Sequence, residues 1–212
     1  MRYKIKLPRA WNKDLAYLFG LLLGDGSLPK TSSLRANGEY QKRHHIYFFS
    51  VFKDFHEEVY IPLFYSLFGI SPRSDVQKNR DKMIYNCRIE SQDIYEYLVM
   101  LGFSNGRKAR LAKVPDIPKK YEVCVLAGLL DTDGGKKGHS FGFTTASKYL
   151  ASFCKRIFDS FSIKYNYCPW IYNGWTYHQI YISRYDVCKL LKIVPLRNKH
   201  KISYLKSIAS VA

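Results

Sequence analysis

The chain has 212 residues, enough for one large domain or two small ones, and its 47% hydrophobic content is typical of a globular protein. Its 34 Lys and Arg residues outnumber 17 Asp and Glu, so a formal net charge of +17 is spread along the chain and indicates a polyanionic partner. The longest apolar run, residues 15–23, is far too short to span a bilayer, which excludes a membrane-spanning protein.

Cysteine and histidine spacing gives no sign of a disulfide framework or a zinc site. The five cysteines are odd in number, widely spaced and lack a C-x-x-C pair, so we expect buried free thiols. The first residues lead into mixed sequence without an apolar signal core. We therefore expect an intracellular protein that is not secreted, in the cytoplasm or nucleoid of a prokaryote or in an organelle matrix.

Hydrophobic periodicity predicts the elements in chain order. The first half reads as a helix, a hairpin, a helix, two strands and a helix, over residues 12–24, 27–50, 53–68, 71–80, 82–90 and 91–101. A connector rich in Gly, Lys, Arg and Pro follows over residues 102–118. The second half repeats the pattern over residues 119–132, a hairpin ending near 145, 147–161, 163–172, 176–183 and 185–191. Each half is therefore predicted to be αββαββα.

An internal repeat supports this division. Leu18–Gly26 (LFGLLLGDG) and Leu126–Gly134 (LAGLLDTDG) are identical at six of nine positions. A second echo joins residues 89–94 to residues 182–187, but the offset falls from 108 residues at the motifs to 93 there. The first half must therefore carry about one extra hairpin arm, which we place in the polar stretch 29–43.

The repeated motif predicts a close helix pair. Gly20 and Gly128 sit among leucines, and Gly24 and Thr132 follow four residues later on the same helical face. Two helix backbones packed along these small residues would bring their C-terminal ends side by side. We expect Asp25 and Asp133 to meet beside that interface.

Two carboxylates at helix C-termini are electrostatically unfavourable, because the helix dipole and their mutual repulsion each cost up to about 1 kcal/mol. A divalent cation would reverse the sign of both effects. The predicted ligands are the carboxylates of Asp25 and Asp133 with the backbone carbonyls of Gly24 and Thr132. An oxygen-only set of this kind suits Mg²⁺ or Mn²⁺ better than zinc.

A simpler explanation is that Asp-Gly ends a buried helix, with the glycine supplying a positive φ. One isolated motif would favour that explanation. A cap does not require aspartate twice at the same helical position in a basic protein, so the pair favours a catalytic role.

The two motifs resemble the signature motifs of LAGLIDADG homing endonucleases, and LAGLLDTDG differs from the family name at only two positions. With the repeated αββαββα pattern, the resemblance covers nearly the whole chain. It implies an α+β fold of two pseudo-symmetric αββαββα halves, each with an antiparallel four-stranded saddle sheet, packed through the two motif helices. The implied halves are residues 1–104 and 119–212, joined by a linker over 105–118.

The resemblance also implies an activity. Such a protein hydrolyses both DNA strands at a long asymmetric target and promotes intron mobility, as a monomer with no obligate protein partner. Asp25 and Asp133, at the eighth motif position, would bind catalytic Mg²⁺, with Mn²⁺ able to substitute. The sixth position, often Asp, is Leu23 in the first motif, but it is not the essential metal ligand.

In the implied mechanism an activated water attacks each scissile phosphate, and a nearby lysine orients the water shell or stabilises developing charge. Lys136, three residues beyond Asp133, is the candidate. Leu28 stands at the matching place in the first half, so the alternative is a solvated loop lysine beside Lys137.

Polar residues alternating on the strands would contact DNA, through ribbons that enter the major groove. The candidates are Arg35, Gln41, Lys42, Arg43, Arg73, Asp75, Gln77, Asn79, Lys82, Asn86, Arg88, Lys137, Lys164, Asn166, Tyr177, Gln179 and Arg184. The basic run over residues 197–201 is expected to meet phosphates.

Two other functions fit the same basic surface. An RNA maturase would assist intron splicing with intron RNA as its partner, and a transcription regulator would bind DNA without cutting it. A regulator built on this fold would usually have lost an acid or gained a helix-turn-helix extension, and neither is seen. Retention of both acids favours cleavage over both alternatives.

Overall fold

The computed structural model of the chain describes residues 5–34, 36–79, 82–104 and 109–210. It forms two compact units, one of residues 1–10 and 25–108 and the other of residues 11–24 and 109–212. The expected halves divided the chain near residue 104. In the structure residues 11–24 go with the second unit, because the helix that they contain packs on the second motif helix.

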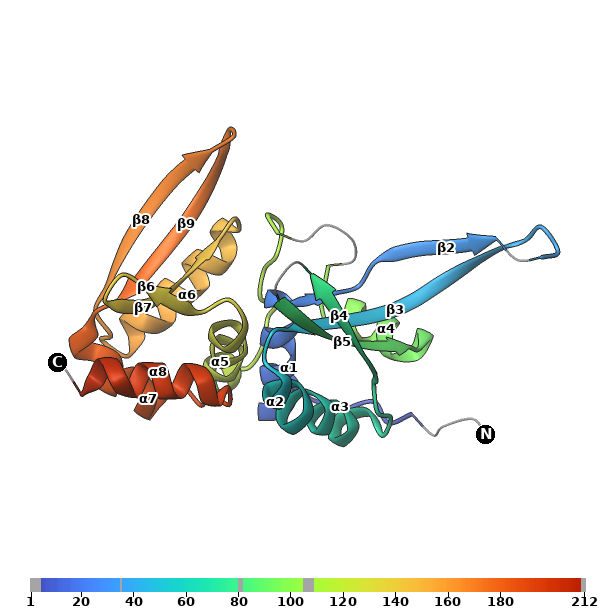
Figure 1. The fold of residues 1–212 in the computed structure, drawn as a ribbon, viewed down its shortest axis with the longest axis horizontal. Helices are drawn as coiled ribbons and strands as arrows, with labels where there is room; N and C mark the ends of the chain where they lie inside the picture. Colours follow the sequence, from blue (N-terminus) through green and yellow to red (C-terminus); the bar gives the residue numbers. More distant parts are fainter. Residues whose placement is uncertain (1–4, 35, 80–81, 105–108, 211–212) are drawn as a thin grey trace. The chain divides into compact units, whose positions relative to one another are not determined.

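The first unit is an antiparallel sheet with helices that bury one of its faces (Figure 1). Its strands are β1 (Gly26–Ser27), β2 (Lys30–Leu34), β3 (Tyr40–Ser50), β4 (Arg73–Asn79) and β5 (Lys82–Glu90), in the order β1-β3-β5-β4 with β2 also paired to β3. Its helices are α2 (Lys53–Phe55), a π-helical turn (His56–Tyr60), α3 (Ile61–Phe68) and α4 (Gln92–Met100). Phe48 of β3 stacks on Tyr60 with 4.0 Å between ring centroids, which ties the sheet to these helices.

The predicted extra arm of the first half is present. β3 has 11 residues, whereas its counterpart β7 in the second unit has 6. The additional length pairs with β2, from Lys30 opposite His44 to Leu34 opposite Tyr40. The arm therefore lies where the polar stretch 29–43 predicted it.

The second unit combines the two motif helices with a four-stranded antiparallel sheet. Its helices are α1 (Lys13–Gly24), α5 (Glu122–Thr132), α6 (Lys148–Ser160), α7 (Val187–Ile193) and α8 (Lys199–Ala209), with 3₁₀ turns at Lys119–Tyr121 and Arg184–Asp186. Its strands are β6 (Gly135–Lys137), β7 (Ser140–Thr145), β8 (Tyr165–Tyr172) and β9 (Trp175–Ile182), in the order β6-β7-β9-β8. β8 and β9 run beyond β7 as a long two-stranded ribbon (Figure 1).

The two sheets share one strand order, which confirms the predicted α+β class with a repeated unit. The first sheet has five strands instead of the expected four, because the extra arm adds β2. Helix α8 was not predicted. Among the described residues, no helix combines the length and apolar character needed to cross a membrane.

All five cysteines are free thiols, as expected. Cys87, Cys124 and Cys154 are buried, but the expectation of burial is wrong for Cys168 and Cys188, which are exposed. Cys168 points away from the core because its partner in β9 is Gln179, whereas the neighbouring pair on β8 and β9 contains the buried Ile180.

Candidate metal and nucleic-acid site

Helices α1 and α5 pack with their backbones in contact, as the small residues of the motifs predicted. A Cβ atom added at Gly20 would overlap the carbonyl oxygen of Val125. A Cβ at Gly128 would overlap the carbonyl oxygen of Tyr17. Any side chain at either position would force the helices apart, so these glycines set the helix separation.

The same contact continues to the ends of both helices. A Cβ at Gly24 would overlap the Thr132 side chain and lie 3.4 Å from Cγ of Asp133. The hydroxyl of Thr132 is fixed there by hydrogen bonds of 3.0 Å to the carbonyls of Gly128 and Leu129. The Thr132 side chain thus leaves no room for a Cβ atom at position 24, so glycine is required there.

Asp133 caps α5 without leaving helical geometry. Its backbone has φ −83° and ψ −15°, its amide donates to the carbonyl of Leu129 at 2.9 Å, and its side chain is exposed. The following Gly134 continues the helical pattern by donating to the carbonyl of Leu130 at 3.1 Å.

Neither motif glycine acts as a left-handed helix cap. The glycines with positive φ among the described residues do not include Gly26 or Gly134. Gly134 is required for a different reason, because a Cβ there would overlap the carbonyl oxygen of Leu130 and lie 2.6 Å from the Phe141 ring. The explanation of Asp-Gly as a simple left-handed helix end is therefore wrong for both motifs.

Side chains from the start of α8 satisfy the last carbonyls of α5. Asn198, which is fully buried, donates to the carbonyl of Asp131 at 3.2 Å. The ammonium group of Lys201 donates to the carbonyls of Thr132 and Gly134, on either side of Asp133. The backbone that carries Asp133 is consequently held by a second helix.

Asp131 is a buried carboxylate in the same network, with a relative exposure of 1%. Its Oδ2 accepts hydrogen bonds from the Tyr17 hydroxyl at 2.5 Å and from the Arg197 amide at 2.7 Å. Burial raises the pKa of Asp131 to about 6, against the opposing effect of these hydrogen bonds and of Lys201. The Arg197 guanidinium lies 4.2 Å from the Tyr17 ring centre and donates to Asp14 at 2.7 Å, so this network joins α1, α5 and the start of α8.

This network corrects the expectation of phosphate contacts for Asn198 and Lys201, whereas Lys199 and His200 of the run 197–201 are exposed. Asn198 and Lys201 are buried, and their side chains donate hydrogen bonds to carbonyls at the end of α5. The N-cap pattern could have revealed the helix, because the Asn198 side chain accepts from the amides of His200 and Lys201 and an apolar stripe follows at Ile202 and Leu205. No sequence pattern indicates which carbonyls this helix caps, since they lie more than sixty residues away along the chain.

The oxygen donors at the motif ends are of the type that Mg²⁺ and Mn²⁺ prefer. Asp133 offers an exposed carboxylate in the second unit. Asp25, the residue after Gly24, is half-buried in the first unit, where its carbonyl accepts from the Phe49 amide at 3.3 Å. The carbonyl of Thr132 is shared with Lys201 and offers a metal only its second lone pair.

No group of three or more His, Cys, Asp or Glu side chains gathers as a metal site within the described ranges. A magnesium ion bound through one or two carboxylates, with water and substrate phosphate completing its shell, does not require such a group. The donor set therefore fits Mg²⁺ at each motif aspartate.

Lys136 and Lys137 of β6 point to opposite faces of their strand. Lys136 pairs with Phe141, whose ring is buried, and Lys137 pairs with Ser140. The Lys136 side chain is nevertheless exposed, because β6 is a three-residue edge strand. Its matching residue in the first unit, Leu28, is fully buried, so no second lysine occupies the equivalent position.

In the first unit, strand register gathers most of the predicted DNA contacts on the face opposite the helices. Arg73 pairs with Arg88, Asp75 with Asn86 and Asn79 with Lys82, while Cys87 between them faces the core. Gln77, Gln41 and Arg43 lie on this open face, and Lys42 lies on the other. Asn86 is only 6% exposed, and Arg35 lies outside the described residues.

Arg43 is engaged within the first unit. It donates to the Ser33 hydroxyl at 2.9 Å and to Glu90 at 3.2 Å. Its guanidinium is therefore oriented before any ligand arrives.

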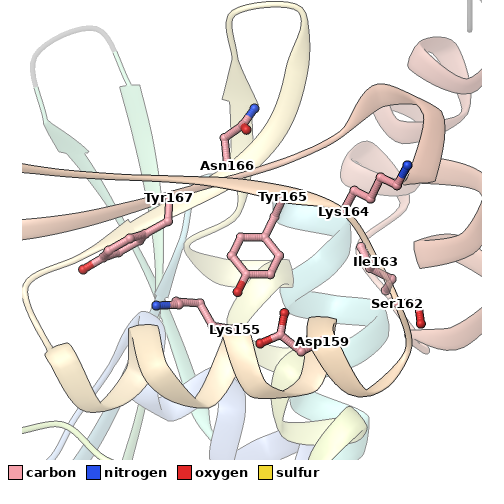
Figure 2. Close-up of a pocket in the computed structure, with 8 residues that line it drawn as sticks. All are labelled: Lys155, Asp159, Ser162, Ile163, Lys164, Tyr165, Asn166 and Tyr167. Carbon is pink, nitrogen blue, oxygen red and sulfur yellow. The ribbon is translucent and has the colours of Figure 1, made fainter.

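In the second unit the same alternation separates two faces of β8 (Figure 2). Tyr165 and Tyr167 point toward α6, where the ammonium of Lys155 lies 4.3 Å from the Tyr167 ring centre, and Asn166 points away. Together with Asp159, Ser162, Ile163 and Lys164, these residues line a hollow between α6 and β8. Lys164, the residue before β8, also borders this hollow, and its side chain points away from α6 (Figure 2).

The remaining predicted contacts of the second unit lie on or beside the open face. Tyr177 and Gln179 share that face with Asn166, but both are partly engaged. Tyr177 stacks on Trp170 at 4.9 Å, and Gln179 accepts from the Tyr181 hydroxyl at 2.5 Å. Arg184, beyond the end of β9, is exposed and donates to the Tyr185 hydroxyl at 2.7 Å.

No protein-family model matches the chain, but solved structures with the same fold do. The homing endonuclease I-DmoI in complex with DNA and Mn superposes with a TM-score of 0.61 and 18% identity, over 86% of this chain and 96% of that one. The meganuclease I-SmaMI bound to uncleavable DNA gives a TM-score of 0.60 and 11% identity, over 92% of this chain and 88% of that one. The fold is that of the single-chain LAGLIDADG homing endonucleases.

This similarity confirms the fold expected from the two motifs. I-DmoI has also been solved with DNA and Ca, with a TM-score of 0.62 and 15% identity over 92% of this chain. At such identities the likeness establishes the fold, and the chemistry of this chain has to be argued from its own residues.

Proposed function

We propose that the protein is a site-specific DNA endonuclease that cuts both strands of a long asymmetric target with Mg²⁺, for which Mn²⁺ can substitute. The observation that carries the proposal is the duplicated Asp-Gly motif, in which neither glycine acts as a left-handed helix cap. A left-handed glycine cap therefore does not explain why aspartate precedes glycine at the end of both motifs. The LAGLIDADG fold, which the DNA-bound I-DmoI and I-SmaMI share, supports the same assignment.

In this proposal each motif aspartate holds one divalent cation, with the neighbouring carbonyl of Gly24 or Thr132 as a further oxygen donor. When bound, the cation polarises the scissile phosphate and stabilises the charge on the leaving oxygen. Asp133 is presented by the end of α5, which Lys201 and Asn198 fix. Holding the carboxylate in one place reduces the reorganisation needed when substrate binds.

Lys136 is our candidate for the lysine that orients the attacking water or stabilises developing phosphate charge. Its exposed ammonium lies on β6, three residues after Asp133. The open faces of the two sheets and the net charge of +17 supply the DNA contacts. Both motifs occur in one chain, so we propose a monomer, and the unequal arms suit a target without a palindrome.

The decisive experiment is cleavage of a plasmid that carries the intronless insertion locus, with Mg²⁺ or EDTA. We expect metal-dependent double-strand cutting by the wild type and none by Asp25→Asn or Asp133→Asn. The matched control is Asp93→Asn, an exposed aspartate in the first turn of α4, which should cut normally. Binding of the same duplex in Ca²⁺ separates a catalytic defect from unfolding.

Intron mobility is the biological role that this activity would serve. A folded protein that leaves the locus intact but binds structured intron RNA, also after loss of both acids, would refute the endonuclease and favour the RNA maturase. A protein that binds DNA, but neither cuts it nor binds RNA, would favour a regulator.

A further inference from the structure

The β8–β9 ribbon differs in chemistry from the rest of this basic protein. Between Lys164 and Arg184 the sequence contains no Lys, Arg, Asp or Glu. The equivalent ribbon of the first unit, β4–β5, carries Arg73, Asp75 and Lys78 on one strand alone. Because phosphate contacts come mainly from Lys and Arg, the β8–β9 ribbon is poorly suited to bind the DNA backbone.

Aromatic rings occupy the open face of the ribbon's far half. Trp170 pairs with Tyr177 and Tyr172 pairs with Trp175, so all four side chains point to the face that carries Asn166 and Gln179. Trp170 is 43% exposed, Tyr172 58% and Trp175 45%. We call these four residues the aromatic ladder.

The ladder is ordered by its own contacts. Trp170 stacks on Tyr177 at 4.9 Å with an interplanar angle of 21°, and its ring centre lies 6.2 Å from that of Tyr172. The Arg110 guanidinium lies over the Trp175 ring. Tyr172 presents the most accessible ring of the ladder, and Trp170 beside it is held by its stacking on Tyr177 before any ligand binds.

A second copy of the chain is a poor occupant for this surface. β8 is the edge strand of its sheet, and an uncharged edge invites pairing with another strand. Pro169 lies within β8, however, and has no amide to donate. The net charge of +17 also opposes self-association and favours a polyanion.

We propose that the aromatic ladder reads thymine methyl groups in the major groove of the target, which makes the β8–β9 ribbon a specificity determinant. The inference rests on the proposed DNA function. A two-stranded ribbon fits the major groove, and the C5 methyl of thymine is the apolar group that base edges present there. Rings with little polar surface match that group better than they match the donors and acceptors of the other bases.

The test begins with duplexes that the protein selects from a random-sequence pool, followed by binding measurements in Ca²⁺. The selected duplex is then prepared with thymidine or with deoxyuridine, which differs only by the missing methyl. We expect thymines under one arm of the site and about fourfold weaker binding for each contacted thymine that is replaced. No loss of affinity with deoxyuridine would overturn the inference.

Variants assign the effect to the ladder. Tyr172→Ala should weaken binding to the thymidine duplex and abolish the deoxyuridine penalty, while Tyr172→Phe, which keeps the ring and loses the hydroxyl, should preserve it. Tyr65→Ala is the matched control, because Tyr65 on α3 has the same 58% exposure. If Tyr172→Ala and Trp170→Ala both still bind the deoxyuridine duplex as much more weakly as the wild type does, the assignment to the ladder is refuted. Loss of this difference in Tyr172→Phe would also refute it.

Two further readouts separate the possible failures. The slope of affinity against salt should be unchanged in Tyr172→Ala, because no phosphate contact is removed. A protein that shows the thymine effect but never cuts would contradict the endonuclease and leave the ladder's role established. Tighter binding to single-stranded than to duplex DNA, without a deoxyuridine penalty, would overturn the inference in favour of stacking on unpaired bases.

Discussion

Lys201 donates a hydrogen bond from its ammonium group to the backbone carbonyl of Thr132, the residue immediately before the metal-binding aspartate that we propose in the second motif. The same ammonium reaches the carbonyl of Gly134. A cation at a helix C-terminus is stabilising, because it opposes the negative end of the helix dipole. Lys201 of α8 thus offsets part of the destabilisation that an aspartate causes at this helix end.

Replacing Lys201 should therefore loosen the end of α5. Lys201→Met keeps the aliphatic packing but leaves two carbonyls without their donor, and we expect a loss of about 1–3 kcal/mol in the free energy of unfolding. Urea denaturation followed by circular dichroism measures it. The control is Lys206→Met on the same helix, at an exposed position, which should change stability by less than about 0.5 kcal/mol. Equal stabilities of the two variants would contradict the capping role.

The contact between α1 and α5 should not tolerate a single added methyl group. Gly20→Ala and Gly128→Ala each place a Cβ against backbone of the opposite helix, which cannot turn aside as a side chain could. We expect each to lower the free energy of unfolding by at least about 2 kcal/mol. Gly135→Ala is the control, because nothing lies within 4 Å of the added atom. A thermal unfolding midpoint that is unchanged in Gly20→Ala would show that the helices are not packed as described.

His56 should make the first unit sensitive to mild acid. Its ring is 1% exposed, lies against Phe48, and has Nε2 2.7 Å from the Cys87 sulfur. Burial lowers the pKa of His56, with Glu57 opposing the shift. The unfolded chain therefore binds a proton below about pH 6.5 that the folded chain does not, and stability falls as the pH drops through this region.

The variant His56→Phe keeps an aromatic ring in the same place and removes the titration. Unfolding free energies of wild type and variant, measured at pH 5 and 7.5, should show a smaller fall for the variant. Parallel losses in the two proteins would exclude His56 as the source.

The two lysines of β6 should have different effects on the reaction. Lys136→Met is expected to slow cleavage by about 100-fold with little change in duplex affinity, because the lost charge acts on the reacting phosphate. Lys137→Met, on the opposite face of the strand, should instead weaken binding and reduce the salt slope by about 1. Single-turnover cleavage and equilibrium binding distinguish them, and an interchange of the two phenotypes would assign the catalytic lysine to position 137.

Periodicity and duplication predicted the parts of the structure that local pattern controls. The alternation of Arg73 and Asp75 placed them correctly on one strand face, and the paired glycines at 20 and 128 correctly predicted a close helix contact. Both depend on spacing within a few residues. The shrinking offset between the repeats indicated an extra arm, and the polar stretch 29–43 correctly located it at β2 and the start of β3.

Local patterns could not predict that α8 caps α5, or that α1 belongs to the second compact unit. The α8 contacts join Lys201 to residues near 133, and a lysine in a basic run looks like any other phosphate ligand until its burial is known. Similarly, the pattern of residues 12–24 predicted a helix but not that its contacts lie with residues 109–212. The aromatic ladder depends on the pairing of Trp170 with Tyr177 and of Tyr172 with Trp175, which alternation within one strand does not reveal.

The membership of α1 in the second unit also orders events during synthesis. Residues 15–23 of α1 are buried throughout, yet their partner α5 begins almost a hundred residues later in the chain. At about 5–20 residues per second the ribosome needs roughly 5–20 s to deliver it. During that interval a strongly apolar helix lacks its main packing partner, so the nascent protein should depend on chaperones until its second motif emerges.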